Sequence, residues 1–406
     1  MEEIIRHLTP ILNEITGYIY PNEIELHWGL LVVIYPYLTG LVAGAFILAS
    51  LVKVFNVKEV QPTYRISLLT ALAFLIVAPL PLLAHLGHPE KSFEIFLTPN
   101  TASAMAMFGF VYAWYLMAVL LLEIWLEYRN DLITWANTEK GWRKWIHKII
   151  SLFSKDTSEK SLRFDEKVSK IITLIGIPSA FLLHGYVGFI FGSIKANPWW
   201  SSVLMPIVFL FSAIVSGISL VLLIYMIITP VRMKQIDMKC VDKIASFMFY
   251  AMIVDFSLEA LDFIHRIYES EESIKILAEM VSGKLFGSLV VIQLLIGMII
   301  PLIAIMMVKL IRKTPDELRK LIYFVSALLV QVGIFSTRWN VVIGGQLFSK
   351  SFRGLTVYKM TFLGLEGLLV SIALLVLPFV ILYILFNILP PWKNSSFRIE
   401  GSNNPR

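Results

Sequence analysis

Five ionisable side chains lie inside apolar stretches of the chain, where charged groups are costly and tend to be functional. Asp255, Glu259 and Asp262 are spaced i, i+4 and i+7, so a helix places them on one face. Arg338 and His184 lie in two other apolar stretches. Carboxylates and imidazoles take up and release protons, and a nearby arginine holds carboxylates ionised. We therefore predict that these five residues form a site that handles protons.

A pocket for an apolar ligand is expected beside these groups. Further histidines and aromatic rings stand near the ends of the same stretches, and an aromatic-lined pocket with a few polar groups is the usual form of a ligand site. A structural interpretation stays open as well. A histidine at the end of a stretch can be an interfacial hydrogen-bonding group, and Arg338 with Glu259 can be a purely structural pair. Along their helices Glu259 lies about 24 Å from Lys243 and Arg338 about 27 Å from Lys320. This equal depth makes Arg338 a plausible partner for Glu259 or Asp262. The predicted ligand contacts are His27, Trp28, Tyr35, His85, Tyr186 and Trp339.

The composition identifies the medium in which these groups lie. Of 406 residues, 57% are hydrophobic and 16% are charged, and the mean hydropathy is +0.75. A soluble protein carries about 25% charged residues, so a soluble enzyme, a disordered chain and a nucleic-acid-binding protein are excluded. The single cysteine, Cys240, excludes an internal disulfide, an iron–sulfur cluster held by this chain alone and a thiolate zinc site. No metal site is predicted.

The elements that position the site are predicted to be membrane-spanning helices. A span needs about 20 apolar residues, and nine runs satisfy this condition. Residues 1–24 are mildly amphipathic and are predicted to lie at the interface, although a tenth span there stays an alternative. The fold class is thus an all-α integral membrane protein with nine or ten spans. The nine runs are 27–52, 66–86, 102–126, 171–194, 203–229, 242–264, 285–308, 321–347 and 361–388.

Lysine and arginine predict the orientation. If the N-terminus lies outside, the segments on the cytoplasmic side carry 25 of the 35 basic residues and the outer segments carry nine, with Arg338 inside a span. Such an asymmetry follows the positive-inside rule. We predict a multi-pass protein of the cell membrane with its N-terminus outside and its C-terminus in the cytoplasm. His27, His85, His184, Glu259 and Arg338 then all lie in the outer half.

Two further patterns predict the domain organisation. The long segment 127–170 alternates Trp and Ile with Lys and Arg at helical spacing, which predicts an amphipathic helix on the inner membrane surface or a docking surface for a soluble partner. The run 38–44, LTGLVAG, resembles the run 211–217, FSAIVSG, four spans later. Small residues at i and i+4 in both runs allow close helix approach and suggest a parallel repeat of two four-helix bundles. The predicted units are an interfacial segment 1–24, a first bundle 25–200 that includes the loop 127–170, a second bundle 201–347, an additional span 348–390 and a tail 391–406.

A series of motifs resembles a known family. The run 37–46, YLTGLVAGAF, is similar to the first-span signature of the NrfD/PsrC-type quinone-interacting membrane subunits. The turn 86–91, LGHPEK, resembles their Leu-Gly-Arg-Pro turn, with His88 in place of the usual arginine. The runs TPNTAS (98–103), YVGF (186–189) and KANPWW (195–200) resemble later motifs in the same order. The run 338–346, RWNVVIGGQ, resembles the larger HybB-type and, more closely, DsrP-type members.

The resemblance implies a fold and a function. It implies two four-helix bundles plus one or two extra spans, a menaquinone pocket near the outer face, and no haem or iron–sulfur cluster bound by this chain. It also implies an extracytoplasmic ferredoxin-like iron–sulfur partner, together with other membrane and cytochrome subunits of a respiratory complex in dissimilatory sulfur or sulfate metabolism. The replacement by His88 leaves the family role of that arginine unassigned here.

Three other functions stay open from the residues alone. A b-type cytochrome would use a pair among His27, His85, His184 and His265 as axial ligands, although two stacked haems would need inner-half histidines. A proton-coupled secondary transporter is disfavoured because its polar site would lie at the midplane between inverted repeats. A passive membrane anchor would keep the polar pairs for structure alone.

Overall fold

The computed structural model describes residues 8–269, 271–311 and 313–392. Nine helical segments within this part of the chain are long and apolar enough to cross a membrane, which confirms the nine predicted spans and the all-α class. Residues 8–29 add no span, so the alternative of a tenth one gains no support from the residues described; residues 1–7 and the tail from 393 lie outside them. The spans are Leu30–Lys53, Lys58–His85, Ala104–Thr138, Glu159–Gly192, Met205–Val231, Met238–Glu269, Phe286–Leu310, Asp316–Gln346 and Leu368–Ile388.

Most spans are single helices, and four are built from consecutive pieces. Span two joins η2, α3 and α4, and span three joins α6, the π-helical turn η4 and α7. Span seven joins the π-helix η5 to α13, and span eight joins α14 to η6. The bounds are α2 Leu30–Lys53, η2 Lys58–Thr63, α3 Tyr64–Val77, α4 Leu80–His85, α6 Ala104–Trp114, η4 Tyr115–Leu120, α7 Leu121–Thr138, α9 Glu159–Gly192, α10 Met205–Val231, α11 Met238–Glu269, η5 Phe286–Ile299, α13 Ile300–Leu310, α14 Asp316–Val342, η6 Gly344–Gln346 and α15 Leu368–Ile388.

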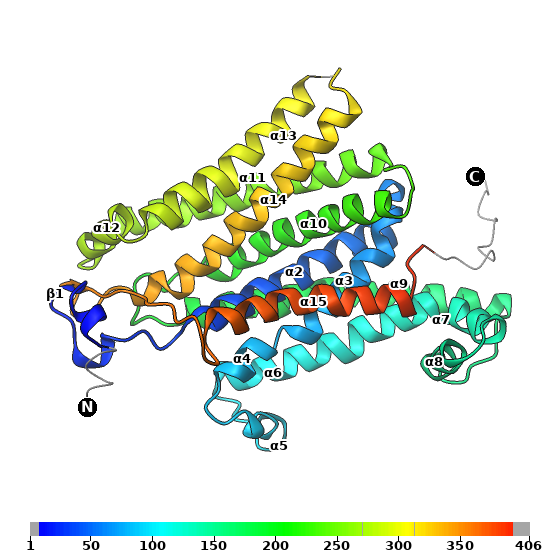
Figure 1. The fold of residues 1–406 in the computed structure, drawn as a ribbon, viewed down its shortest axis with the longest axis horizontal. Coiled ribbons are helices and arrows are strands. Elements are labelled where there is room, and N and C mark those ends of the chain that lie inside the picture. Colours follow the sequence, from blue (N-terminus) through cyan, green and yellow to red (C-terminus); the bar gives the residue numbers. More distant parts are fainter. Residues whose placement is uncertain (1–7, 270, 312, 393–406) are drawn as a thin grey trace.

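The helices α2 and α10 form the centre of the molecule (Figure 1). Both are apolar all round, as a helix buried on every side requires. In the most apolar stretch of α2, 89% of the residues are buried. A Cβ atom on Gly217 would lie 2.4 Å from backbone atoms of Gly44, so the two helix backbones touch. These glycines belong to the two similar runs found in the sequence. The small residues of the suspected repeat therefore meet each other at one crossing.

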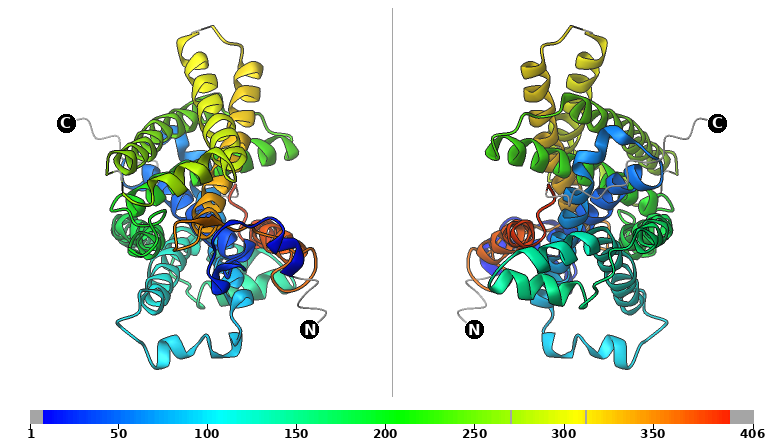
Figure 2. Two further views of the ribbon diagram at one scale, coloured as in Figure 1. Left: turned by 90° about the vertical axis from the view of Figure 1, so that its left-hand side faces the viewer. Right: turned by 90° about the vertical axis from the view of Figure 1, so that its right-hand side faces the viewer.

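The other helices surround this pair. Helices α3, α9 and α14 also contact α2, while α9, α11 and α14 contact α10. The π-helix η5 and α13 pack on α14, and α15 packs on α3 at the opposite side (Figure 2). Since α14 reaches both α2 and α10, residues far apart in sequence meet near the centre. The division into bundles at residues 200 and 347 stays a prediction.

The segment 127–170 differs from the prediction of a single surface helix. Helix α7 continues to Thr138, α8 spans Trp142–Ile150, and α9 already begins at Glu159. The long spans thus extend beyond the expected boundaries, because Arg129 on α7 is tied to Asp165 on α9 at 2.6 Å. Only α8 is the short amphipathic helix, and it leaves apolar rings such as Trp145 exposed, as expected for a helix at a membrane interface.

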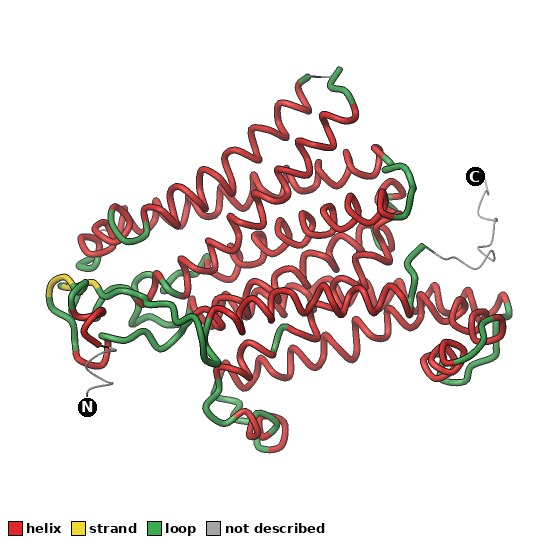
Figure 3. The backbone as a smooth tube through the Cα atoms, viewed as in Figure 1, coloured by secondary structure: helices red, strands yellow, loops and turns green. Residues whose placement is uncertain are grey.

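A cap of loops, short helical turns and two short strands covers the end opposite α8 (Figure 3). Strand β1 (Thr16–Gly17) pairs antiparallel with β2 (Gly354–Leu355), so the N-terminal segment is joined to the link between α14 and α15. Lys359 donates a hydrogen bond to Glu14, which lowers the pKa of the Glu14 carboxyl group below its usual range. The last span therefore begins only at α15, later than predicted. The short elements are η1 Pro21–Glu23, η3 Pro89–Lys91, α5 Glu94–Leu97, α8 Trp142–Ile150, α12 Ile274–Ser282, β1 and β2.

Candidate functional site

Arg338 is completely buried and joins helices from both halves of the sequence. Its Nη2 atom donates to Ser212 Oγ on α10 at 2.5 Å and lies 3.1 Å from His184 Nε2 on α9. The guanidinium group also lies over the ring of Phe209, 4.2 Å from its centre. His184, itself fully buried, stacks on the same ring. The predicted residues His184 and Arg338 are therefore direct neighbours.

The geometry determines which nitrogen of His184 carries a proton. Arginine has only donors, so the Nε2 atom that faces Arg338 must accept a hydrogen bond. The proton of the neutral ring then lies on Nδ1, which is 3.2 Å from Thr39 Oγ1 on α2. Thr39 in turn reaches the carbonyl group of Tyr35 at 3.2 Å. Both ring nitrogens are thus engaged, and the imidazole is neutral.

Two carboxylates on α11 complete the buried cluster. Asp255 is 1% exposed, and neither of its carboxylate oxygens has a hydrogen-bond partner among the described residues. Glu259, one helical turn further, uses Oε2 to accept from Gln293 Nε2 at 3.0 Å, while its Oε1 has no partner there. Both carboxyl groups are close enough to interact electrostatically with the guanidinium group of Arg338. A buried arginine with two incompletely hydrogen-bonded carboxylates is a costly arrangement, which makes this cluster a candidate functional site.

The prediction that Arg338 pairs directly with Glu259 or Asp262 is wrong. Within the part of the chain described, Arg338 forms no ion pair within 4 Å and instead bonds to His184 and Ser212. Asp262 pairs with Arg266, one turn along α11, at 2.9 Å and also accepts from Ser202. Equal depth along two helices is therefore insufficient evidence for contact, because it does not determine the direction of each side chain.

A cavity of about 560 Å³ lies between α10, α11, η5 and α14. This volume falls in the usual range for small-molecule sites, about 300–1,000 Å³. Its walls are mainly apolar, and lining residues such as Phe263 and Ile264 are exposed on the outer surface of α11, so the cavity opens toward the lipid. Asp255, His184 and Arg338 do not line it. The polar groups that do are Glu259, Asp262, Arg266, Gln293, Thr337 and Asn340.

A chain of hydrogen bonds orients the carboxylate that faces the cavity. Ser288 donates to Asn340 Oδ1 at 2.6 Å, Asn340 Nδ2 donates to Gln293 Oε1 at 2.7 Å, and Gln293 donates to Glu259. Trp199 Nε1 donates to the carbonyl oxygen of Asn340 at 2.9 Å. Ser288 and Gln293 both lie on η5, and π-helical segments frequently occur at functional sites. Glu259 Oε1 is buried beside the cavity and has no hydrogen-bond partner among the described residues.

The predicted ligand contacts do not gather at this cavity. Tyr35 and Tyr186 both contact Phe108 and form an aromatic group between α2, α6 and α9. The Trp28 ring stacks on the Trp200 ring, with 5.1 Å between the ring centres. The backbone N–H of Trp28 donates to Gln346 Oε1, and its carbonyl oxygen accepts from Gln346 Nε2. His27 is exposed in a loop. His85 faces Glu366 at 2.7 Å and Trp339 contacts Tyr358, and these two partners lie together beside Gly29, away from the cavity.

Sequence reasoning missed the neutral polar residues of the site. A predicted ionisable residue is reached by hydrogen bonds, directly or through one another, from five such residues: Gln293, Asn340, Ser288, Ser212 and Thr39. Ionisable groups stand out in an apolar run because they are the costly ones in lipid, whereas neutral polar groups do not. Gln293 could have been found as a candidate site residue, because it is an amide in an otherwise apolar run.

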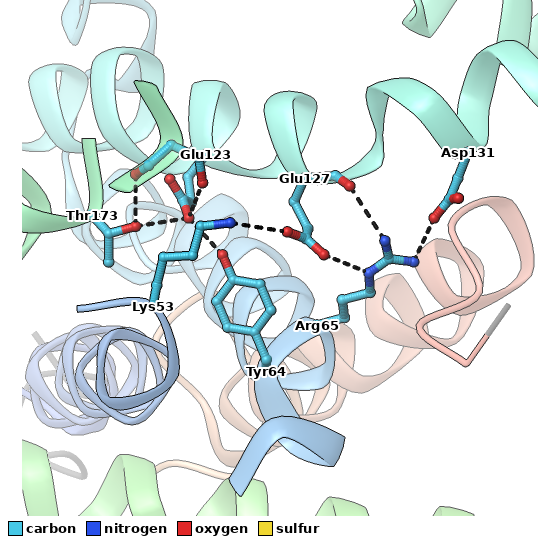
Figure 4. Close-up of polar contacts among 8 residues, drawn as sticks. Lys53, Tyr64, Arg65, Glu123, Glu127, Asp131 and Thr173 are labelled. Atoms are coloured by element: carbon cyan, nitrogen blue, oxygen red, sulfur yellow. Dashed lines mark hydrogen bonds and ion pairs between the residues drawn. The ribbon is translucent and has the colours of Figure 1, made fainter. Parts of the chain in front are cut away.

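Another buried carboxylate, Glu123, belongs to a separate group of polar contacts (Figure 4). Glu123 on α7 is 0% exposed, and its Oε1 accepts from Tyr64 at 2.6 Å, Thr173 at 2.8 Å and Ser169 at 3.0 Å. One turn along α7, Glu127 pairs with Arg65 at 2.9 Å. This cluster is separate from the cavity, and it holds α3, α7 and α9 together.

The fold and the site define the class: a multi-pass α-helical membrane protein with a lipid-facing cavity next to buried titratable groups. The chain belongs to the NrfD family, because the family model described as "Polysulphide reductase, NrfD" matches residues 21–350. This match confirms the family resemblance seen in the sequence motifs.

Curated relatives agree with this membership. The chain is 35% identical over 206 residues to a selenate reductase subunit of Mesobacillus selenatarsenatis, covering 49% of this chain and 47% of that protein. It is 24% identical to the Hdr-like menaquinol oxidoreductase integral membrane subunit of Archaeoglobus fulgidus, over 85% of this chain and 77% of that one. Protein NrfD of Escherichia coli is 26% identical over 49% of this chain and 59% of its own length. The match thus spans about half of the selenate reductase subunit.

Proposed function

We propose that the chain is the quinone-interacting membrane subunit of a respiratory redox complex. The observation that carries the proposal is the lipid-facing cavity lined by Glu259, whose buried Oε1 has no hydrogen-bond partner among the described residues. A quinone is lipid-soluble, has an apolar tail and a polar ring, and takes up two protons with two electrons. An apolar cavity with one oriented proton-binding group fits that chemistry.

The residues of this chain would supply proton handling and orientation. Glu259 holds or releases a proton at Oε1, and Gln293 keeps the carboxylate in place through Oε2. Asp255, one turn further into the cluster, is the next proton-binding group, and Arg338 balances the charge of both carboxylates. The neutral His184 fixes Arg338 from the opposite side. The electrons enter or leave through a partner.

The finer assignments belong to the same proposal. Menaquinone is the proposed quinone, in line with the name of the Archaeoglobus relative. The proposed partner is an extracytoplasmic ferredoxin-like iron–sulfur subunit that docks at the cap formed by β1 and β2. Other membrane and cytochrome subunits would complete the complex, and dissimilatory sulfur or sulfate metabolism remains the proposed context. The cell membrane is the proposed location, with the N-terminus outside.

The substitution Glu259→Gln tests the role of the free carboxylate. We expect the variant to fold, because glutamine keeps the acceptor for Gln293. Menaquinol-linked electron transfer in membranes that contain the assembled complex should fall at least tenfold. Glu269→Gln is the matched control, since Glu269 lies at the exposed end of the same helix and should leave the rate unchanged. Equal rates in both variants would overturn the assignment of Glu259.

Direct ligand binding gives a second measurement that needs no partner. Trp199 lines the cavity, so a menaquinone analogue should quench part of the tryptophan fluorescence of the purified chain. Trp199→Phe should remove that part. A Soret band in the purified chain would instead support the b-type cytochrome alternative, and substrate uptake into vesicles without a redox partner would support a transporter. The structure disfavours His184 as an axial ligand, because both of its nitrogens are already engaged.

A further inference from the structure

A basic cleft lies at the opposite end of the molecule from the cap. It has a volume of about 500 Å³ and is formed by η2, the end of α10, the loop that leads to α11, and the residues after α15. Lys58 and Gln61 come from η2, Arg232 and Lys234 come from the loop, and Trp392 closes one side. The cleft is therefore assembled from three separate parts of the sequence.

The cleft carries uncompensated positive charge. Among the described residues, no ion pair is formed by any of four lining cations, which are Lys58, Arg232, Lys234 and Lys239. The other lining arginine, Arg65, is neutralised by Glu127 at 2.9 Å and Asp131 at 2.7 Å (Figure 4).

The two lining carboxylates are already occupied. Glu59 faces Lys243 outside the cleft at 4.0 Å. Asp237 caps the start of α11 by accepting from the backbone N–H of Lys239 at 2.9 Å. Asp237 keeps its charge and offsets one of the four free cations, which leaves a net charge of about +3 (four minus one). The cleft therefore favours an anion.

The position of Arg232 is suited to a phosphate group. Its guanidinium lies over the Trp392 ring at 3.7 Å from the ring centre, so the stacking fixes the plane and leaves the N–H edges available. Arginine N–H groups form strong, charge-assisted hydrogen bonds to phosphate oxygens. Unlike the lysines beside it, Arg232 is thus held in one place before any ligand arrives.

The apolar surroundings favour a lipid over a soluble anion. Val231 is 77% exposed and Met233 is 98% exposed, and both flank Arg232 in sequence at the end of a membrane span. Exposed apolar side chains beside free cations are typical of the membrane interface, where basic pockets between helices bind anionic headgroups. We propose that this cleft binds the phosphate headgroup of an anionic phospholipid, such as phosphatidylglycerol or cardiolipin.

The experiment compares lipid binding to the full-length chain in neutral detergent. Phosphatidylglycerol, cardiolipin and phosphatidylcholine are added separately, and binding is measured by native mass spectrometry together with the thermal midpoint. The wild type should retain the two anionic lipids and rise in midpoint, and it should gain little from phosphatidylcholine. The double variant Lys234→Glu/Lys239→Glu should weaken binding of the anionic lipids at least tenfold. Arg232→Ala should weaken it independently.

The matched control is Lys155→Glu/Lys160→Glu, which makes the same change in charge at exposed positions outside the cleft. It should bind anionic lipid as the wild type does. Equal losses in both double variants would show a general charge effect and would overturn the proposed site. Equal binding of phosphatidylcholine would overturn it as well. Competition with inorganic phosphate completes the experiment. If phosphate displaces the anionic lipid at the concentrations at which the lipid itself binds, the ligand is a free anion and the lipid assignment is wrong.

Discussion

Arg338 is the buried cation on which both parts of the candidate site depend. On one side it bonds to His184 and Ser212, and on the other it balances the charges of Asp255 and Glu259. A charge without solvent is tolerated only while its partners remain. The role of Arg338 is therefore first electrostatic, because a nearby cation favours the charged form of the two buried carboxyl groups.

Replacing this arginine should destabilise the protein strongly. Arg338→Met keeps the apolar stem but removes the contacts to His184 and Ser212 and the cation near both carboxyl groups. Removing one partner of a buried ion pair costs about 3–5 kcal/mol, which is an upper bound here because Arg338 has no direct ion pair. We expect a large fall in the thermal midpoint of the purified chain. Adding Asp255→Asn should restore part of the loss, because it removes one of the two carboxyl groups that lose their neighbouring cation. Arg353→Met, at an exposed arginine, is the control; a midpoint of Arg338→Met as high as that of the control would contradict this account.

At the level of single residues, the sequence identified the ionisable groups and missed their partners. The face shared by Asp255, Glu259 and Asp262 follows from helical spacing alone. Which of them points into the cavity does not, because that depends on the rotation of α11 against η5 and α14. Gln293 could not be assigned for the same reason, since an amide becomes part of the site only through the neighbours that it meets.

Among the helices, the contact between α2 and α10 organises the molecule. Gly44 and Gly217 allow the two backbones to touch, which a larger side chain at either position prevents. Thr39 on α2 and Ser212 on α10 lie toward the same end of these helices and reach His184 and Arg338. The glycine crossing therefore also determines whether the buried network can form.

The crossing can be tested by adding volume. A Cβ atom on Gly217 would lie 2.4 Å from Gly44, so Gly217→Val forces the helices apart and should cost about 3 kcal/mol, at the upper end of overpacking effects. Gly185→Ala is the matched control within a membrane helix, because its nearest atom outside the helix lies at 3.8 Å. Thermal midpoints of both variants measure the difference. If the two variants lose the same small amount, the crossing is not the close contact described here.

At the scale of the whole molecule, the two ends differ in chemistry. One end carries the β1–β2 cap and the buried network with its cavity, and the other carries the basic cleft and the cluster around Glu123. The number and approximate limits of the spans followed from hydropathy, since the membrane requires about 20 apolar residues for each crossing. The extension of α7 to Thr138 did not follow, because its charged final turns are stabilised by ion pairs with other helices. Hydropathy contains no information on such pairs.

The difference between the ends leads to a prediction of orientation. Positive charge gathers at the end of the basic cleft, so this end should face the cytoplasm and the cap should face outward. Cys240 is the single cysteine and is fully buried, which makes Cys240→Ser a clean background for labelling. In that background, Lys350→Cys should react with a membrane-impermeant maleimide added to intact spheroplasts. Lys155→Cys should react only after permeabilisation.

The outcome distinguishes orientation from mere accessibility. Lys350 and Lys155 are both exposed in the folded chain, so a failure to label must come from the membrane and not from burial. The Cys240→Ser chain without an added cysteine should remain unlabelled in both conditions. Labelling of Lys155→Cys in intact spheroplasts, with protection of Lys350→Cys, would invert the orientation. The cavity and its proposed iron–sulfur partner would then belong to the cytoplasmic side, and the headgroup cleft would belong to the outer leaflet.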